Sequence, residues 1–530
     1  MHRARFALRR SLAGGGGCRI LAGVKVDPVR WHQVELERRE VMRRYGEDNH
    51  AAGALDAMRA LARKEPMLPT VQIDLVSLAL AVSEYDQARS SAMRLMKIAR
   101  GNFAAMRAAA DAFQLLGEED RAMAAWRSIT ASGERATALA SMARLAERAG
   151  RMDEAADWIG RALKLDGRDA MTVLTAGRIA ARRGELDQAA ALLDRCTHPV
   201  VPAGLRSQAL YELGEVNDRL GDAANAVRAW RTAKEALEEG FADKIRLARR
   251  VREKVLERNR RLCELLQPET MRRWREAVPV SPLPPMAILA GHPRSGTTLL
   301  EQVLAAHPAV ADIDEKDALA SSIRETLFPN VPEGPSIDGL GEVSRDDLAL
   351  TRRDYLRRVT MLRPSLSSDG LVLDKNPNLT DFLPFVLRPF PETKLLVARR
   401  DPRDILLSCY RLPVLPQSGN IGWMREQDAV EDYRSMMSVW ETLRECLGDE
   451  CGWREVLYET LCTDFDNEAR SITEFLGLRW DPAQADYRST RADSPASSPS
   501  YAAVRAPVHT GSIGRWKRYA DLLPRLFEGF

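Results

Sequence analysis

The chain changes its hydrophobic pattern once, near residue 265. From about residue 30 to 260 it is rich in Ala, Leu, Arg and Glu, contains little Pro and repeats its apolar residues at the helical period. After a Pro-rich stretch, short apolar runs alternate with helix-like stretches; the runs are MAILAG (286–291), GLVLDKNP (370–377), TKLLVARRDP (393–402) and GWREVLYE (452–459). Such alternation predicts a parallel sheet with helices on both faces. We therefore expect an all-α N-terminal part followed by an α/β part.

The helical part contains an internal repeat. The phrases SEYDQA, GEEDRA, GRMDEA, GELDQA and GDAANA begin at Ser83, Gly117, Gly150, Gly184 and Gly221, so the steps between them are 34, 33, 34 and 37 residues. Each phrase predicts a turn between two helices, and its final Ala opens the second helix. Small residues before and after the turns would let paired helices approach closely; they are Ala110, Ala143, Gly177 and Gly214, then Ala122, Ala155, Ala189 and Ala226.

A helix–turn–helix unit of this length and pattern resembles the tetratricopeptide repeat, over roughly residues 65–240. Stacked repeats bury a shared core and expose a concave groove. The resemblance implies either a groove that holds a peptide or protein partner, or a spacer or dimerisation arm. The sequence leaves the oligomeric state open, and a homodimer is compatible with it.

Composition narrows the function classes. The 530 residues suggest about two or three domains, and a net charge of +3 argues against a broad surface for nucleic acid or anionic membrane. No stretch approaches the roughly 20 apolar residues of a membrane span. The seven cysteines show no metal-ligand spacing, which favours free thiols and a cytoplasmic location. The Arg-rich start lacks an apolar core, so we expect residues 1–29 to be a disordered tail or to precede the true start.

Candidate chemistry gathers just after the apolar runs, where ligands of parallel sheets bind. The first run is followed by GHPRSGTT, in which the backbone N–H groups from Ser295 to Thr298 would point at an anion. Gly296 would let the chain turn closely around the anion, Thr297 would add a hydroxyl, and Arg294 would add charge. A Walker A loop would have Lys in place of Thr297. The simpler alternative is a turn that caps a helix.

The third run ends in RRDPRDILLSCYR. Arg400 lies at the predicted strand end, and Ser408 follows eight residues later in the next helix. A guanidinium and a hydroxyl in this arrangement could hold a second phosphate. The alternative is a surface loop whose Arg and Asp residues pair with each other.

Together, PRSGTT and RRDPRD…S resemble the nucleotide-dependent sulfotransferases, which use 3'-phosphoadenosine 5'-phosphosulfate (PAPS). The chain is most similar to the branch that contains the tyrosylprotein sulfotransferases and bacterial proteins joining tetratricopeptide repeats to such a domain. The resemblance spans about residues 285–520. It implies a tetratricopeptide-repeat solenoid at 30–264, a Pro-rich linker at 265–285 and a P-loop-like, nucleotide-binding sulfotransferase domain with a central parallel sheet at 286–530.

The resemblance also implies roles for individual residues. The family's 5'-phosphosulfate loop matches Arg294, Ser295, Gly296, Thr297 and Thr298, and its 3'-phosphate ligands match Arg400 and Ser408. A nucleotide-contacting Tyr matches Tyr458, and a basic residue in the segment that closes over the cofactor matches Arg515. The branch's further Arg, four residues past the Ser, falls here on Leu412, with Arg411 one residue early.

For catalysis, the resemblance implies Glu315 as the base, Lys375 as a stabiliser of the transferring group and Ser500 as a transition-state stabiliser. The acidic neighbourhood departs from the usual Gly-rich one, and Asp314 is a rival for the base. Because neighbouring like charges raise one another's pKa, the cluster suits a base without choosing among its members. The donor carries the activated group, so no metal is expected.

The sequence therefore predicts transfer of a sulfuryl group from PAPS to an acceptor hydroxyl by in-line displacement. The acceptor is left open between a peptide tyrosine, a carbohydrate and a small molecule. One rival is a Mg-dependent kinase or NTPase, in which Thr298 would meet Mg²⁺ and Asp374 would end a Walker B strand. The other is a non-catalytic repeat scaffold with a degenerate sulfotransferase domain.

Overall fold

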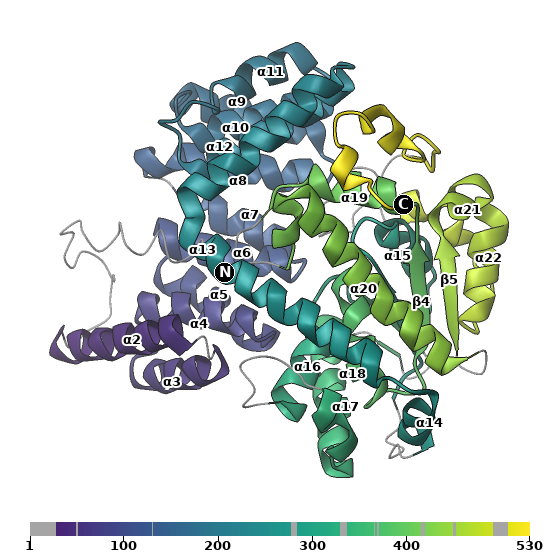
Figure 1. Ribbon diagram of the computed structural model, residues 1–530. Helices are drawn as coiled ribbons and strands as arrows, with labels where there is room; N and C mark the ends of the chain where they lie inside the picture. Colours follow the sequence, from purple (N-terminus) through teal and green to yellow (C-terminus); the bar gives the residue numbers. More distant parts are fainter. Residues whose placement is uncertain are drawn as a thin grey trace. The chain divides into compact units, whose positions relative to one another are not determined.

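The computed structural model describes residues 28–48, 51–129, 131–276, 283–328, 337–364, 366–367, 370–414, 419–448, 452–490 and 507–530 (Figure 1). The chain divides into two compact units. Residues up to Glu147 together with Arg151–Thr175 form unit 1, and Arg148–Gly150 together with Ala176–Phe530 form unit 2. This division falls within the repeats, whereas the sequence places its domain boundary at residues 264 and 265; those limits stay a prediction, and most of the predicted tail at 1–29 lies outside the described residues.

Unit 1 is built from helices that pack on their neighbours in the chain, with α4 against α5, α5 against α6 and α6 against α7. Its helices are α2 (Pro28–Asp48), α3 (Ala51–Lys64), α4 (Pro69–Ala81), α5 (Tyr85–Ile98), α6 (Phe103–Leu115), α7 (Glu119–Arg127), α8 (Ser132–Arg148), α9 (Met152–Leu165) and the first part of α10 (Ala170–Arg183). Unit 2 continues with α11 (Leu186–Asp194), α12 (Ala203–Arg219) and α13 (Ala223–Leu265).

The predicted repeat turns are present in the backbone. Ser83, Gly117, Gly150, Gly184 and Gly221 have φ values of 57°, 76°, 80°, 86° and 93°. This left-handed region favours glycine, so the glycines end one helix and redirect the chain into the next. The second helix of each pair begins two residues after the turn residue, earlier than the predicted Ala. The tetratricopeptide-type helical region is thereby confirmed.

The small residues of the repeats allow the close helix contacts that the sequence predicts. A Cβ added at Gly214 on α12 would lie 2.2 Å from Nε1 of Trp230 on α13, and one added at Gly177 would lie 2.8 Å from Cγ of Leu193. The alanines that follow the turns are fully buried; they are Ala122, Ala155, Ala189 and Ala226.

The C-terminal part of unit 2 holds a five-stranded parallel sheet in the order β2-β3-β1-β4-β5. The strands are β1 (Met286–Gly291), β2 (Val310–Asp312), β3 (Leu371–Lys375), β4 (Lys394–Arg399) and β5 (Trp453–Leu457). Four of them are the four predicted apolar runs, which confirms the predicted parallel sheet. The short β2, which pairs with β3 at the edge of the described sheet, was not predicted because three residues carry no periodic signal.

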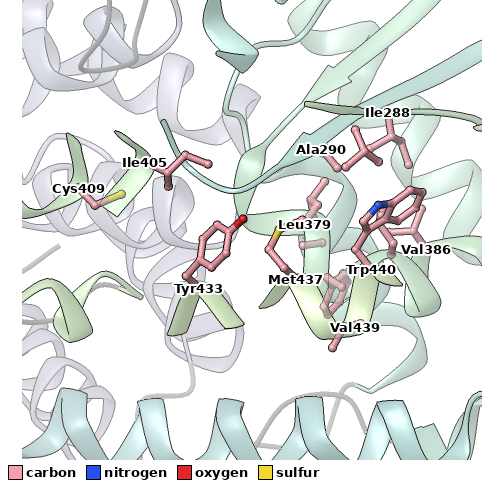
Figure 2. Packing of buried hydrophobic residues seen from close by; sticks show 14 of the residues in the cluster. Ile288, Ala290, Leu379, Val386, Ile405, Cys409, Tyr433, Met437, Val439 and Trp440 are labelled. Carbon is pink, nitrogen blue, oxygen red and sulfur yellow. The ribbon is translucent and has the colours of Figure 1, made fainter. Parts of the chain in front are cut away.

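Alternate side chains of the central strands β1, β3 and β4 enter two different cores. Ala287 and Leu289 of β1 pack with α15 (Thr297–Ala305) and α22 (Phe465–Phe475) on one face. On the other face Ile288 and Ala290 pack with Trp440 of α20 (Glu426–Leu447), as Figure 2 shows. The fold therefore has the helix–sheet–helix layers predicted from the sequence.

The remaining helices complete these layers and the loops between them. They are α14 (Pro268–Glu276), α16 (Ala318–Leu327), α17 (Arg345–Leu362), α18 (Leu383–Leu387), α19 (Pro402–Tyr410), α21 (Tyr458–Thr463) and α23 (Tyr487–Thr490). Short 3-10 turns are η1 (Ile337–Glu342), η2 (Pro377–Phe382), η3 (Ile421–Met424), η4 (Pro482–Gln484), η5 (Arg515–Tyr519) and η6 (Pro524–Leu526).

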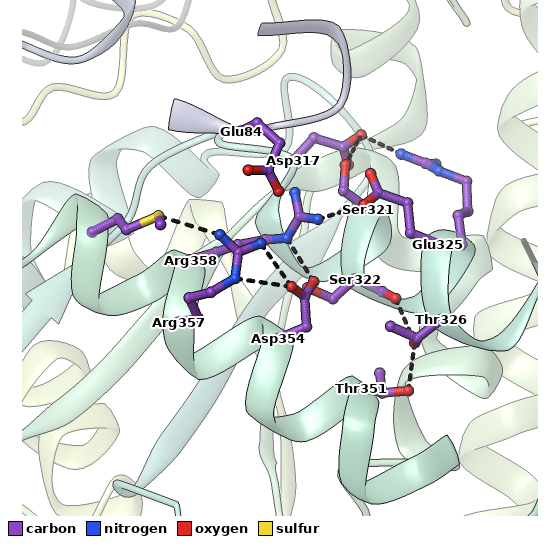
Figure 3. A network of polar contacts seen from close by, with 12 residues as sticks. Glu84, Asp317, Ser321, Ser322, Glu325, Thr326, Thr351, Asp354, Arg357 and Arg358 are labelled. Atoms are coloured by element: carbon purple, nitrogen blue, oxygen red, sulfur yellow. Dashed lines mark hydrogen bonds and ion pairs between the residues drawn. The ribbon is translucent and has the colours of Figure 1, made fainter. Parts of the chain in front are cut away.

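A polar network joins α16 to α17 (Figure 3). The carboxylate of Asp354 accepts hydrogen bonds from Ser322 at 2.8 Å and from Nε of Arg358 at 2.7 Å, and Arg358 also pairs with Glu325 at 2.6 Å. Arg358 is fully buried, so these partners offset the cost of its burial. The network therefore ties the middle and the last turns of α16, which begins three residues after the predicted base at Glu315, to α17.

The last repeat helices and the α/β part share one hydrophobic core within unit 2. Trp230 of α13 and Trp440 of α20 belong to the same buried cluster. Nε of Arg252 on α13 donates to Asp432 on α20 at 2.6 Å. Helix α14 lies inside the predicted linker and buries Trp274, so this part of the segment is packed. None of the helices in the described ranges is long and apolar enough to cross a membrane.

Candidate active site

The loop after β1 wraps tightly at the carboxyl edge of the sheet. Gly296 is the N-cap of α15 and has φ 103°, and Arg294 has φ 76°. A Cβ at Gly296 would lie 2.5 Å from Cδ2 of Tyr458, the first residue after β5. Only glycine fits between the loop and this ring, so the loop and Tyr458 form one wall of the site.

The loop presents buried polar groups without protein partners. Oγ of Ser295 and Nε of Arg400 are buried and accept or donate no hydrogen bond among the described residues. Thr297 and Thr298 are buried in the first turn of α15, where backbone N–H groups have no partner within the helix. Because buried polar groups are normally bonded, Oγ of Ser295 and Nε of Arg400 mark a place that an anionic ligand would complete.

The residues predicted for the two phosphate groups are in direct contact. Nε of Arg294 donates to Oγ of Ser408 at 2.9 Å. Nη1 of Arg400 donates to the carbonyl of Arg294 at 3.2 Å, and its guanidinium carbon lies 4.5 Å from the ring centroid of Tyr458. Burial, and then the neighbouring guanidinium groups of Arg400 and Arg411, lower the pKa of Arg294. Arginine stays protonated even so, and the cations are concentrated where an anion would offset them.

Arg515 lies against α12 in this structure, and its predicted contact with the cofactor stays a prediction. Its guanidinium pairs with Asp218 on α12, a residue that the sequence placed only in the repeats. Arg411 also turns towards α12, where its Nε donates to Glu215 at 2.8 Å. Sequence reasoning missed both acids because nothing in a repeat helix marks them as part of a distant site. Ser500 lies outside the described residues, so its predicted role is left as a prediction.

Lys375 ends β3 and gathers three carboxylates. Its Nζ lies 3.1 Å from Glu301 on α15, 3.1 Å from Asp314 and 2.8 Å from Glu315. Burial by itself would lower the pKa of Lys375, but the carboxylates, Glu301 foremost, outweigh it and raise the pKa above its usual range. The structure therefore brings the predicted lysine, the predicted base and its rival together.

The three acids differ in exposure. The side chains of Glu301, Asp314 and Glu315 are 2%, 14% and 30% exposed. Burial raises the pKa of Glu301 well above its usual range, and one of its oxygens, Oε1, has no hydrogen-bond partner in the described part of the chain. Sequence reasoning missed Glu301, although a single acid inside the apolar run TTLLEQVL was the available signal.

Asp374, the Walker B residue of the rival hypothesis, points away from the loop. It alternates with Lys375 along β3 and accepts a hydrogen bond at 3.0 Å from the hydroxyl of Tyr355 on α17, on the face opposite α15. Burial raises the pKa of Asp374 to about 7. Among the residues described, no group of three or more His, Cys, Asp or Glu side chains is arranged to hold a metal ion; the absence of a metal requirement stays a prediction.

A comparison with protein-family models matches residues 285–482 to the sulfotransferase family. This stretch is a sulfotransferase-family domain. The domain contains the loop after β1, the Lys375 cluster and α19, while Tyr519, Arg515 and the repeats lie outside the matched residues.

The chain is also similar to curated proteins at about a quarter identity. An uncharacterised protein of Aquifex aeolicus (strain VF5) is 25% identical over 344 residues, which cover 62% of this chain and 42% of that protein. Protein-tyrosine sulfotransferase A of Caenorhabditis elegans is 24% identical over 212 residues, covering 37% of this chain and 51% of that protein. The chain thus spans about half the length of these curated relatives. The solved sulfotransferase domain of the Synechococcus PCC 7002 olefin synthase is 20% identical, with a TM-score of 0.32 over 45% of this chain and 88% of that one.

Proposed function

We propose that the chain transfers a sulfuryl group from PAPS to an acceptor hydroxyl. The observation that carries the proposal is the anion cradle formed by the loop after β1 and by Arg400 after β4. Oγ of Ser295 and Nε of Arg400 are buried there and have no hydrogen-bond partner in the described part of the chain, beside the Arg294–Ser408 pair. This cradle lies in a domain that matches the sulfotransferase family. A nucleotide with charge at both its 5' and 3' ends fits two adjacent cationic groups better than a single phosphate does.

The donor, when bound, supplies the activated sulfuryl group. The backbone N–H groups of the loop, the hydroxyls of Ser295, Thr297 and Thr298, and Arg294 would hold its 5' end. Arg400 and Ser408 would hold its 3'-phosphate, and the ring of Tyr458 would close the side of the loop. Gly296 lets that ring lie directly against the loop, because any Cβ there would collide with Tyr458.

Glu315 is the residue that we assign to accept the proton of the acceptor hydroxyl. It is the most exposed of the three acids around Lys375, and it contacts Nζ at 2.8 Å. Asp314 is more buried, at 14% exposure against 30%, so its carboxylate is less accessible to a substrate. Lys375 is held charged by its neighbours and would stabilise negative charge as it develops on the leaving oxygen.

The positions of Asp374 and Thr297 do not support the rival NTPase hypothesis. Asp374 lies on the sheet face opposite α15 and is bonded to Tyr355. The loop also has Thr297 where the P-loop lysine would lie. For the acceptor we propose a peptide tyrosine as the first class to test, because the matched nematode relatives are named protein-tyrosine sulfotransferases.

The Glu315→Gln variant tests the assignment of the base. Glutamine keeps an oxygen that can accept the hydrogen bond from Lys375 but cannot take up a proton. We expect turnover to fall by about 10²–10⁴-fold, the usual contribution of a general base, while the affinity for 3'-phosphoadenosine 5'-phosphate (PAP) is unchanged. Asp314→Asn is the matched control, with turnover within a few-fold of wild type. Wild-type turnover in the Gln variant, or its loss in the Asn variant alone, would contradict the assignment.

A further inference from the structure

Asp218 is a buried carboxylate in the last turn of α12, with a side chain that is 1% exposed. Four donors from the C-terminal half of unit 2 surround it. Nη1 of Arg518 donates at 3.1 Å and Nη2 of Arg411 lies at 3.3 Å, while Arg515 and the hydroxyl of Tyr519 also donate to it. An acid at the C-terminal end of a helix is disfavoured by the helix dipole. Its position is therefore explained by these partners and not by the repeat to which it belongs.

One set of these contacts leads to the anion loop through α19. Arg411 follows the last residue of α19 and is held by Asp218 and by Glu215, one turn earlier on α12. Ser408, on the last turn of α19, accepts the hydrogen bond from Arg294 of the loop. The end of α19 is thus fixed between the last repeat and the loop.

A second set of contacts leads to Arg400. The carbonyl of Ser512 accepts a hydrogen bond at 2.5 Å from Nη2 of Arg400, and the carboxylate of Asp404 on α19 accepts from the backbone N–H groups of Gly514 at 2.7 Å and Trp516 at 2.9 Å. Residues 512–519 therefore run as a strap from Arg400 to Asp218. Asp218 anchors the far end of the strap through Arg515, Arg518 and Tyr519.

We propose that Asp218 is a positioning residue for the anion site, so that the last repeat sets the place of Ser408 and Arg400 and thereby the affinity for the 3'-phosphate of the nucleotide. The inference rests on the proposed function, because it assigns the 3'-phosphate to these two residues. On this proposal α12 positions residues of the nucleotide site in addition to packing as a repeat helix. Asp218 itself contacts no substrate.

The test compares two nucleotides on the full chain. PAP carries the 3'-phosphate and adenosine 5'-monophosphate lacks it. The dissociation constant of adenosine 5'-monophosphate divided by that of PAP therefore isolates the contribution of the 3'-phosphate. In the Asp218→Asn variant we expect this ratio to fall on the order of tenfold, as for other groups that orient a direct ligand contact, with the affinity for adenosine 5'-monophosphate changed less than about twofold. Asp222→Asn, four residues on at the exposed start of α13, is the matched control and should leave both affinities unchanged.

A merely structural role would lower both affinities together or neither. A folded Asp218→Asn chain with the wild-type ratio would overturn the inference. If that variant does not fold, Glu215→Gln serves instead, because Glu215 is partly exposed and its charge holds Arg411. A wild-type ratio in the Glu215→Gln variant would then overturn the inference. A wild-type chain that binds neither nucleotide would overturn the proposed function and this inference with it; wild-type binding of PAP with an unchanged ratio in the variants would overturn the inference alone.

Discussion

Replacing Lys375 with methionine should destabilise unit 2 in a pH-dependent way. Methionine preserves most of the side-chain volume and removes the cation that Glu301, Asp314 and Glu315 share. Glu301 is 2% exposed, so its charge would be left buried without the cation that offsets it. Removing one member of a buried ion pair typically costs about 3–5 kcal/mol, and we expect a loss of this size near pH 8.

The loss should shrink as the pH falls. Burial raises the pKa of Glu301 in the folded state, and removing Lys375 raises it further. A carboxyl group whose folded pKa is above its unfolded value contributes stability below the unfolded pKa, and this contribution is lost as the pH rises through the folded pKa. At pH 5 the neutral acid should leave mainly the lost hydrogen bonds, each worth about 1 kcal/mol.

Urea unfolding at pH 5 and pH 8 measures this difference, with hydrogen exchange in β1 and β3 as the probe so that only unit 2 is followed. Lys394→Met is the matched control, because Nζ of Lys394 donates to the carbonyl of Phe475 at 2.8 Å and forms no ion pair among the residues described. Its cost should be the same at both pH values. An equal loss at pH 5 and pH 8 for the Lys375 variant would refute the reasoning that Glu301 is the charge left behind.

Two further predictions concern the anion cradle. Gly296→Ala should weaken PAP binding by about tenfold or more in calorimetry. A residue with a Cβ pays about 1–2 kcal/mol for the left-handed backbone, and that Cβ would lie 2.5 Å from Tyr458. The control variant Gly341→Ala, with nothing within 4 Å of its Cβ, should bind PAP as wild type does. Arg400→Gln should reduce PAP affinity by about tenfold or more while adenosine 5'-monophosphate binds nearly as before, since one charge-assisted contact contributes about 1.5–3 kcal/mol; equal weakening of both nucleotides would show that Arg400 does not hold the 3'-phosphate.

Local chemistry made much of the fold predictable. The turn residues of the repeats recur at nearly constant spacing, and glycine at four of the five turns reveals the left-handed backbone. The strands β1, β3 and β4 are largely buried and so appear as nearly continuous apolar runs, whereas the edge strand β5 is only partly buried. The anion loop could also be predicted, because Gly296 and its neighbours in sequence supply this part of the site within a few residues.

The rest of the site depends on contacts between distant residues. Arg515 and Asp218 are 297 positions apart, and no pattern near either residue indicates the other. Glu301 lies in an apolar helix and acquires its role only because β3 places Lys375 against it. The end of α12 is part of unit 2 for a similar reason, since its partners lie on α19 and in residues 512–519.

Calorimetric titration of the full chain with PAP, beside ATP with Mg²⁺, tests the central claim most directly. The loop after β1, Arg400 and Ser408 together predict one PAP site per chain, with an affinity at least about tenfold higher than for ATP with Mg²⁺. The same titration on Gly296→Ala should show the loss of that site. Tighter binding of ATP with Mg²⁺ than of PAP, or no binding of PAP, would contradict the account.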